Sequence, residues 1–187
     1  ITTLLNSEID GQKVPVEYVM GVCNLMLVAG VDTTWSSIGA SLWHLAQHPE
    51  HRQQLRDDPE LWPAAVEELL RAYAPVTMAR IVDRDIDFQG CPMKAGDRVL
   101  MSFPAANRDP EQFENPNEVI FDREHNRHVA FGAGIHRCAG SNLARLELRV
   151  ALQTWLERIP EFELADPSTV TWAGGQVRGT RIAKVKF

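Results

Sequence analysis

The feature that most constrains the fold is a long apolar segment at residues 15–46. Pro15 lies near its start and His48-Pro49 follow its end, which are the expected start and stop signals of a helix. With a rise of about 1.5 Å per residue, such a helix crosses most of a domain. Its middle, residues 22–31, is apolar nearly all round, so we expect it to be buried rather than half-exposed.

Shorter helices are predicted on both sides of the chain's middle. One covers residues 50–56, and another begins after Asp58, a candidate N-cap, and ends near Tyr73, before Pro75. The last helix is predicted over residues 139–158, where the apolar residues recur with helical spacing. Its expected apolar face consists of Leu143, Leu146, Val150 and Leu156.

Short strands and loops are predicted between and after these helices. Residues 78–88 alternate as a strand does, and residues 98–103 form a further strand. Residues 107–127 are rich in Pro, Asn, Asp and Glu and predict a long irregular stretch, and residues 163–187 predict short strands and turns. The predicted class is therefore mainly α with small β-sheets.

Composition excludes some classes of protein. The 187 residues are 44% hydrophobic and 24% charged, as expected for one soluble globular domain, and the net charge of −6 argues against nucleic acid as a partner. Residues 1–13 lack the apolar core of a signal peptide, and the longest purely apolar run, residues 25–29, is far shorter than a membrane span. We expect a cytoplasmic protein with no membrane segment here. The first residue is Ile1 rather than Met, so we expect the native start to be missing. The sequence leaves open whether a membrane anchor precedes Ile1.

The cysteines are few and widely spaced. Neither a disulfide framework nor a zinc site is predicted, because both need closer Cys or Cys/His pairs. His125, His128 and His136 lie near the last cysteine, but their spacing repeats no known zinc-ligand pattern. The three cysteines are Cys23, Cys91 and Cys138.

The glycine-rich segment at residues 131–140 brings Cys138 to the start of the predicted last helix. Unpaired N–H groups and the helix dipole there favour a thiolate. Gly132 and Gly134 permit a close backbone approach, Gly140 leaves room beside the sulfur, and Phe131 can shield it. The alternative is a buried cysteine at an ordinary loop–helix junction. Two further residues of the segment, His136 and Arg137, are cationic partners for carboxylates.

The pattern Phe-x-x-Gly-x-His-x-Cys-x-Gly resembles the haem-binding signature of the cytochrome P-450 superfamily. The resemblance implies haem b as the cofactor, with Cys138 as the axial ligand of the iron and His136 bound to a haem propionate. A thiolate ligand pushes electron density onto the iron and favours O–O cleavage. The pattern is filled by Phe131, Gly134, His136, Cys138 and Gly140, with Gly132 at the commonly accompanying glycine.

The middle of the long helix contains an acid beside two alcohols. A buried Asp32 needs a partner, and Gly30 costs up to about 1 kcal/mol relative to Ala inside a helix. One interpretation is a helix bent by Thr hydroxyls that bond back to the preceding turn. The stretch also resembles the family's oxygen-activation motif, which implies that Asp32 and Thr33 deliver protons to O₂. On this resemblance Ala29 and Gly30 leave space for O₂, and Thr34 is a less essential neighbour.

Glu68 and Arg71 lie three residues apart on one helix face. They could be a solvated surface pair, but Glu-x-x-Arg at this distance before the cysteine resembles the family's second signature. The resemblance implies a buried triad completed by a second arginine, for which Arg123 is the best candidate and Arg127 the alternative. Arg80 resembles a propionate-binding arginine of the family; its alternative is an ordinary strand-surface residue.

The resemblance runs along essentially the whole chain and is best to bacterial, soluble, ferredoxin-dependent members. It implies a monooxygenase that inserts one atom of O₂ into an organic substrate, with electrons from NAD(P)H through ferredoxin reductase and ferredoxin. Such members are about twice this length, so residues 1–187 are expected to be the C-terminal, haem-binding portion, inactive alone. The alternatives are a haem-thiolate sensor or electron carrier, or a fragment that needs its N-terminal half. Asp32 and Thr33 favour the enzyme, because a carrier needs no proton delivery.

Substrate and partner contacts are the least defined features. Arg137 and Arg145 flank Cys138 and predict a cationic patch for an acidic ferredoxin, unless they serve the propionates or the core. A mostly apolar substrate is expected, since small-molecule pockets are mostly apolar. Its candidate lining, which could equally be ordinary core, is Leu25, Val28, Ala29, Val76, Met78 and Val177.

Overall fold

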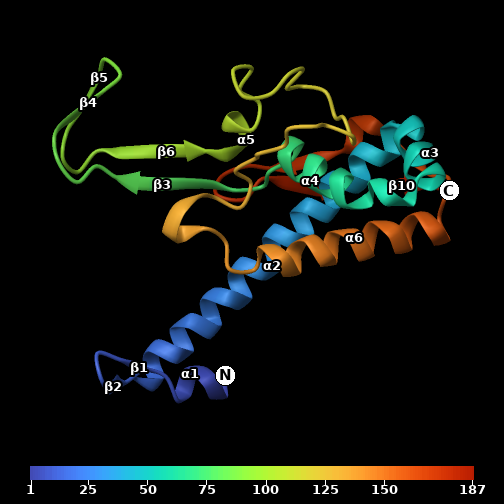
Figure 1. Cartoon of the computed structure of the whole chain (residues 1–187). Helices are drawn as coiled ribbons and strands as arrows, with labels where there is room; N and C mark the ends of the chain where they lie inside the picture. Colours follow the sequence, from blue (N-terminus) through green and yellow to red (C-terminus); the bar gives the residue numbers. More distant parts are fainter.

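The helices of the computed structural model, which describes all 187 residues, gather around one half of a long central helix (Figure 1). This helix, α2, has its N-terminal half projecting away from the rest, beside the short α1 and the hairpin β1–β2. The prediction of a mainly α protein with small sheets is confirmed. The helical elements are α1 (Thr2–Leu5), α2 (Val16–Gln47), α3 (Pro49–Asp57), η1 (Pro59–Leu61), α4 (Trp62–Ala72), α5 (Phe103–Ala106), η2 (Gly134–His136), α6 (Ser141–Arg158) and η3 (Pro167–Thr169).

The strands form five antiparallel pairs rather than one sheet. In the longest pair, Thr77 lies opposite Ser102 and Ile81 opposite Arg98, and a second hairpin extends from its far end (Figure 1). The strand predicted over residues 78–88 is therefore two strands with a break at 82–85. The pairs are β1 (Glu8–Ile9) with β2 (Gln12–Lys13), β3 (Thr77–Ile81) with β6 (Arg98–Ser102), β4 (Ile86–Phe88) with β5 (Cys91–Met93), β7 (Glu163–Leu164) with β10 (Val185–Lys186), and β8 (Thr171–Ala173) with β9 (Gly179–Ile182).

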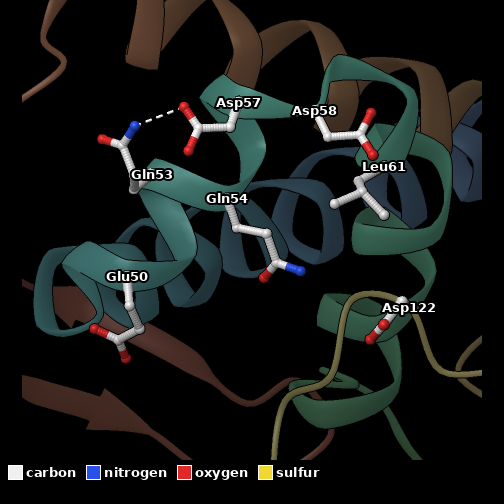
Figure 2. A pocket seen from close by; sticks show the side chains of 7 residues that line it. All are labelled: Glu50, Gln53, Gln54, Asp57, Asp58, Leu61 and Asp122. Atoms are coloured by element: carbon white, nitrogen blue, oxygen red, sulfur yellow. Dashed lines mark hydrogen bonds between the residues drawn. The ribbon is translucent and has the colours of Figure 1, made fainter.

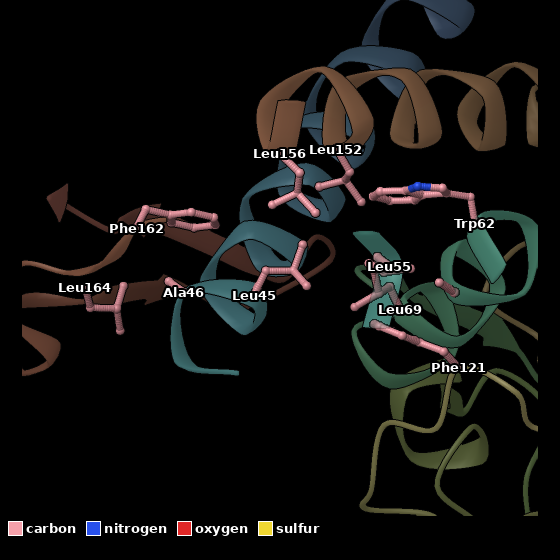
Figure 3. Packing of buried hydrophobic residues seen from close by; sticks show 11 residues of the cluster. Leu45, Ala46, Leu55, Trp62, Leu69, Phe121, Leu152, Leu156, Phe162 and Leu164 are labelled. Carbon is pink, nitrogen blue, oxygen red and sulfur yellow. The ribbon is translucent and has the colours of Figure 1, made fainter. Parts of the chain in front are cut away.

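The main core lies where the C-terminal end of α2 meets α3, α4 and α6 (Figure 3). Phe121, from the irregular stretch, and the C-terminal strands complete it. Burying such large side chains contributes roughly 1.5–3 kcal/mol each. The core residues are Leu45, Ala46, Leu55, Trp62, Ala65, Leu69, Phe121, Leu152, Leu156, Phe162 and Leu164.

A second, smaller core ties the cysteine segment to the helices. Val66, Leu70 and Ala74 pack with Ala130 and with Leu148 of α6, and Phe131 lies against this group. The segment that carries Cys138 is therefore anchored at its start by ordinary hydrophobic burial, before its glycines begin.

Two glycines let α2 pack closely against β9. A Cβ at Gly39 would lie 2.4 Å from Oγ1 of Thr180, and one at Gly179 would lie 2.4 Å from Cβ of Ser36. At Gly179 a side chain would require the backbone of α2 to move, because Cα of Ser36 would lie only 2.9 Å away, whereas at Gly39 it would require the Thr180 side chain to turn. The C-terminal tail is thus held directly on the middle of α2.

The prediction that residues 22–31 are buried is wrong for this chain. Leu25 and Val28 are about two-thirds exposed, as is Val31, because no element of the 187 residues packs on this face. Helix α2 is long and apolar enough to cross a membrane. A single such helix is weak evidence of a membrane span, because core helices of soluble proteins meet the same criterion.

The predicted apolar face of the last helix is also largely wrong. Leu143, Leu146 and Val150 are exposed, whereas the buried stripe runs through Leu148, Leu152 and Leu156. Spacing of three or four residues fits both sets, and contacts with α2 and α4 decide which one is covered. The helix begins at Ser141, two residues later than predicted.

Candidate functional site

The cysteine segment is a tight loop that presents Cys138 to solvent. Gly132 and Gly134 have φ of +70° and +69°, in the left-handed region that favours glycine. The Cys138 N–H donates to the Phe131 carbonyl at 2.9 Å, closing the loop. A Cβ at position 140 would lie 3.9 Å from the sulfur, so Gly140 keeps that side open. The cysteine lies three residues before the first residue of α6, exposed and without a disulfide partner.

A charged network supports the loop from the side of α4. Arg145 donates two hydrogen bonds to Glu67 and stacks over the Phe131 ring at 4.6 Å. Nε2 of His128 lies 3.0 Å from Oε2 of the same carboxylate. Burial alone would raise the pKa of Glu67, but hydrogen bonds from His128 and Arg145 lower it to about 2. The carboxylate therefore stays ionised and holds both partners in place.

This network was missed by the sequence analysis. His128 appeared there only as a rejected zinc ligand, and Arg145 as a candidate partner contact; both in fact bond to Glu67. The available signal was the doubled acid Glu67-Glu68, which puts one carboxylate on each of two neighbouring helix faces. Arg137, by contrast, is exposed and is the freer of the two flanking arginines.

The acid–alcohol motif lies on α2 where the helix leaves the core. Asp32 is 44% exposed and pairs with Nη1 of Arg181 in β9 at 3.1 Å. The Thr33 hydroxyl donates to the Ala29 carbonyl at 2.6 Å, one turn back. The Thr34 hydroxyl lies 3.4 Å from a carboxylate oxygen of Glu147 and links this level of α2 to α6. Asp32 thus has a partner, as expected of an acid in an apolar helix.

The pair Glu68 and Arg71 is fully buried. Two parallel hydrogen bonds of 2.8 Å join them, and both side chains are 0% exposed. Nε of Arg123 adds bonds of 3.1 Å to both oxygens of Glu68, and its side chain is only 7% exposed. Arg127 is exposed and makes no contact with Glu68. The three side chains are therefore brought together as one ionic cluster.

This ionic cluster organises the irregular stretch at residues 107–127. Arg71 donates to the carbonyls of Asn107, Pro116 and Glu118 at 2.7–2.8 Å. Glu68 also accepts from Nδ2 of Asn126 at 3.0 Å, a contact that sequence reasoning missed because nothing in the local pattern marks that residue. The buried Asn107 accepts from the Val129 N–H at 2.8 Å. The cluster is thereby connected to the residues just before the cysteine loop.

The other predicted site residues do not form one enclosed group. His136 and Arg80 are exposed, and Arg80 bonds only to its own neighbour, the Ala79 carbonyl. Val76 and Val177 pair through an isolated bridge, and Met78 follows on β3. Leu25 and Val28 lie on the exposed face of α2. The structure therefore gathers the candidate pocket residues into two groups, one on α2 and one around β3.

The chain belongs to the cytochrome P450 family: the sequence profile described as Cytochrome P450 matches residues 1–61 and 57–171. The probable cytochrome P450 127A1 of Sinorhizobium fredii is 41% identical over 179 residues, covering 96% of this chain and 43% of that protein. The polyketide biosynthesis cytochrome P450 PksS of Bacillus subtilis is 39% identical over 175 residues, covering 92% and 43%. The solved structure of PksS superposes with a TM-score of 0.93 over 98% of this chain and 48% of the solved one.

The chain thus spans about half the length of the relatives it matches. The family implies a haem cofactor and monooxygenase chemistry, and the residues present fit a haem. Cys138 is an exposed soft ligand on a glycine-lined loop. His136 and Arg80 are exposed and have no carboxylate partner in the chain, so their nitrogens are free to bind propionates. The exposed apolar face of α2 is an apolar surface of the kind a flat porphyrin covers.

Proposed function

We propose that this chain is the C-terminal, haem-binding part of a cytoplasmic P450 monooxygenase that inserts one atom of O₂ into an organic, mostly apolar substrate. The observation that carries the proposal is the loop at residues 131–140, which uses two left-handed glycines to expose a single unpaired cysteine. A thiolate-bound haem supplies an electron-rich iron for splitting O₂. Cys138 is the proposed iron ligand, with Phe131, Gly132 and Gly140 shaping its surroundings.

Asp32 and Thr33 are the proposed proton-delivery residues. The Thr33 hydroxyl uses its hydrogen on the Ala29 carbonyl, so its oxygen lone pairs remain free to accept a further hydrogen bond. Asp32 is half-exposed beside Arg181 and can exchange protons with solvent. Ala29 and Gly30, with no bulky side chain, keep the helix surface next to this pair open. This arrangement favours the enzyme over a haem-thiolate carrier, which has no use for proton delivery.

The proposed propionate contacts are His136 and Arg80, and the proposed structural triad is Glu68, Arg71 and Arg123. In this role the triad holds the irregular stretch and, through it, the start of the cysteine loop. It acts on folding and loop position and makes no contact with substrate.

The substrate and the electron source are the finer parts of the proposal. A relative named as a steroid C26-monooxygenase, from Mycolicibacterium smegmatis, is 37% identical over 170 residues, which supports a bulky apolar substrate. The proposed contacts are Leu25, Val28, Val76, Met78 and Val177. Electrons are proposed to come from NAD(P)H through ferredoxin reductase and ferredoxin, with the exposed Arg137 near Cys138 as a docking contact. The chain alone is proposed to be inactive, since the α2 face lacks a cover.

The test is the absorption spectrum of the full protein, reduced and exposed to carbon monoxide. A thiolate-bound haem gives a red-shifted band that a histidine-bound haem lacks. Cys138→His should retain haem but lose this band, whereas Cys91→Ser, at an exposed cysteine on β5, should keep it. A red-shifted band in Cys138→His would refute the assignment of the ligand.

A further inference from the structure

Three histidines meet at the junction of α2 and α3, apart from the residues assigned to the haem. His44 lies near the end of α2, His48 lies between the two helices, and His51 lies in the first turn of α3. One ring nitrogen from each lies within 4.8 Å of the other two. The spacing of four and then three residues would align them on one helix face.

We propose that this histidine cluster is a binding site for a divalent transition-metal ion of the zinc type. Nε2 of His44 and Nδ1 of His51 are already 2.8 Å apart and share one proton. A metal ion replaces that proton once the two nitrogens have moved further apart than 2.8 Å, and the proton moves to Nε2 of His51. Three imidazole ligands suit zinc, with water completing a tetrahedral shell.

Two of the rings already have partners on their other nitrogen. The Tyr73 hydroxyl lies 2.8 Å from Nδ1 of His44, and Oε1 of Glu50 lies 2.7 Å from Nδ1 of His48. Metal-binding histidines usually donate their second N–H to such a group, which selects the tautomer and orients the ring. Here the partners leave Nε2 of both rings available to the metal.

The surroundings of the cluster are acidic. Glu50, the partner of His48, also lines a surface concavity of about 740 Å³ along α3 (Figure 2). Three more carboxylates, from Asp57, Asp58 and Asp122, line the same concavity. Glu50 thus joins the histidine cluster to an acidic concavity through its contact with His48.

The rings of His48 and His51 have to turn for the three nitrogens to converge, because the three rings are stacked on one another. His48 stacks on His44 with ring centroids 4.2 Å apart and planes inclined by 24°, so their lone pairs do not yet meet. The His48 side chain is 41% exposed and has room to turn about its Cβ–Cγ bond. His51 is also stacked on His44, with ring centroids 5.0 Å apart and planes inclined by 25°, so it has to tilt against Phe121 as well. His44, bonded to Tyr73, is the fixed part of the site.

The experiment titrates zinc chloride into the full, haem-loaded protein after dialysis against a chelator, followed by calorimetry and by X-ray absorption at the zinc edge. We expect one equivalent of zinc, with imidazole nitrogens at about 2.0–2.1 Å. His48→Gln and His51→Gln should each weaken binding at least about tenfold. His125→Gln, at an exposed histidine outside the cluster, is the matched control and should bind zinc as the wild type does.

His48 and His51 are chosen because both are more exposed than His44, so their variants should retain the fold; thermal melting without zinc checks this. Absence of saturable zinc binding would overturn the proposal. So would wild-type affinity in His48→Gln and His51→Gln, or sulfur ligands in the absorption spectrum, which would place the ion at a cysteine. None of these outcomes depends on monooxygenase activity.

Discussion

Two regions of this chain differ in whether their polar and apolar groups find partners within the 187 residues. Around Glu68 every strong charge has partners inside the 187 residues, and the neighbouring core is closed. Around Cys138 and the N-terminal half of α2, a thiol, the side chains of His136 and Arg80, and a broad apolar face are left open. The closed region explains what holds the fold together, and the open region contains the residues that we propose to bind haem and substrate. Substitutions in the first should change stability, and those in the second should change chemistry.

The largest effect is expected from Glu68→Ala in the full protein. It leaves Arg71 and Arg123 buried without their carboxylate, which should cost about 3–5 kcal/mol of unfolding free energy. The measurement is denaturant unfolding together with the yield of haem-loaded protein. Asp85→Ala, which removes an exposed pair with Lys94, is the control and should leave the unfolding midpoint unchanged. Equal midpoints for both variants would show that the closed region does not depend on its ionic cluster.

Thr33→Ala should leave stability and the carbon monoxide spectrum intact but change the reaction. Without the hydroxyl, electrons and O₂ should be consumed to give hydrogen peroxide with little product. Asp32→Asn should instead slow O₂ consumption, by about 10²-fold, the lower range for general acid catalysis. The measurement is product formed per reduced cofactor consumed. Uncoupling by Thr34→Ala, with Thr33→Ala still coupled, would move the assignment by one residue.

The third expected effect is acid sensitivity of the closed region, caused by His44. Its pKa in the folded protein, about 3, lies below the unfolded value near 6.5, so only the unfolded chain gains a proton as the pH falls between them. The contribution of His44 to the free energy of unfolding is complete above pH 6.5 and declines below it, by about 2 kcal/mol between pH 7 and pH 5. His44→Gln, compared at both pH values with chelator present, should lose most of this decline, and His125→Gln should keep it.

The smallest effect is expected from Arg137→Glu in the open region. Reversing an exposed charge beside Cys138 should raise the apparent KM for an acidic ferredoxin several-fold and make the rate less sensitive to salt. Peroxide-driven turnover, which needs no ferredoxin, should be unchanged. Parallel loss of both activities would indicate damage to the loop rather than to a docking contact.

The sequence predicted local elements better than it predicted what covers them. The long helix was expected at residues 15–46 and spans Val16–Gln47, because its Pro signals are local. Asp58 was expected as a cap, and its side chain does accept from the Glu60 N–H, although a turn of 3₁₀ helix precedes α4. Burial of residues 22–31 was wrong because it depends on neighbours that periodicity does not reveal.

The residues of the candidate site likewise divide into those that a local motif predicts and those that depend on long-range contacts. Cys138, Glu68 and Arg71 could be selected because their motifs are short and continuous in the sequence. The contacts of Asn126 with Glu68 and of His128 with Glu67 join residues about sixty positions apart through an irregular stretch, which has no periodic signal. The spacing of His44, His48 and His51 is visible in the sequence, but the helix break at His48 is not, and neither are the ring contacts with Tyr73 and Phe121.

Because Gly39 and Gly179 leave no room between α2 and β9, the helix and the C-terminal tail should behave mechanically as one body. Arg181 lies two residues after Gly179 and pairs with Asp32, seven residues before Gly39. Any bending of α2 at this level must carry Arg181 with it, so the pair can open only by rotation of the two side chains. The close packing at Gly39 and Gly179 thus separates the Asp32–Arg181 pair, part of the proposed proton-delivery site, from the larger movements of the chain.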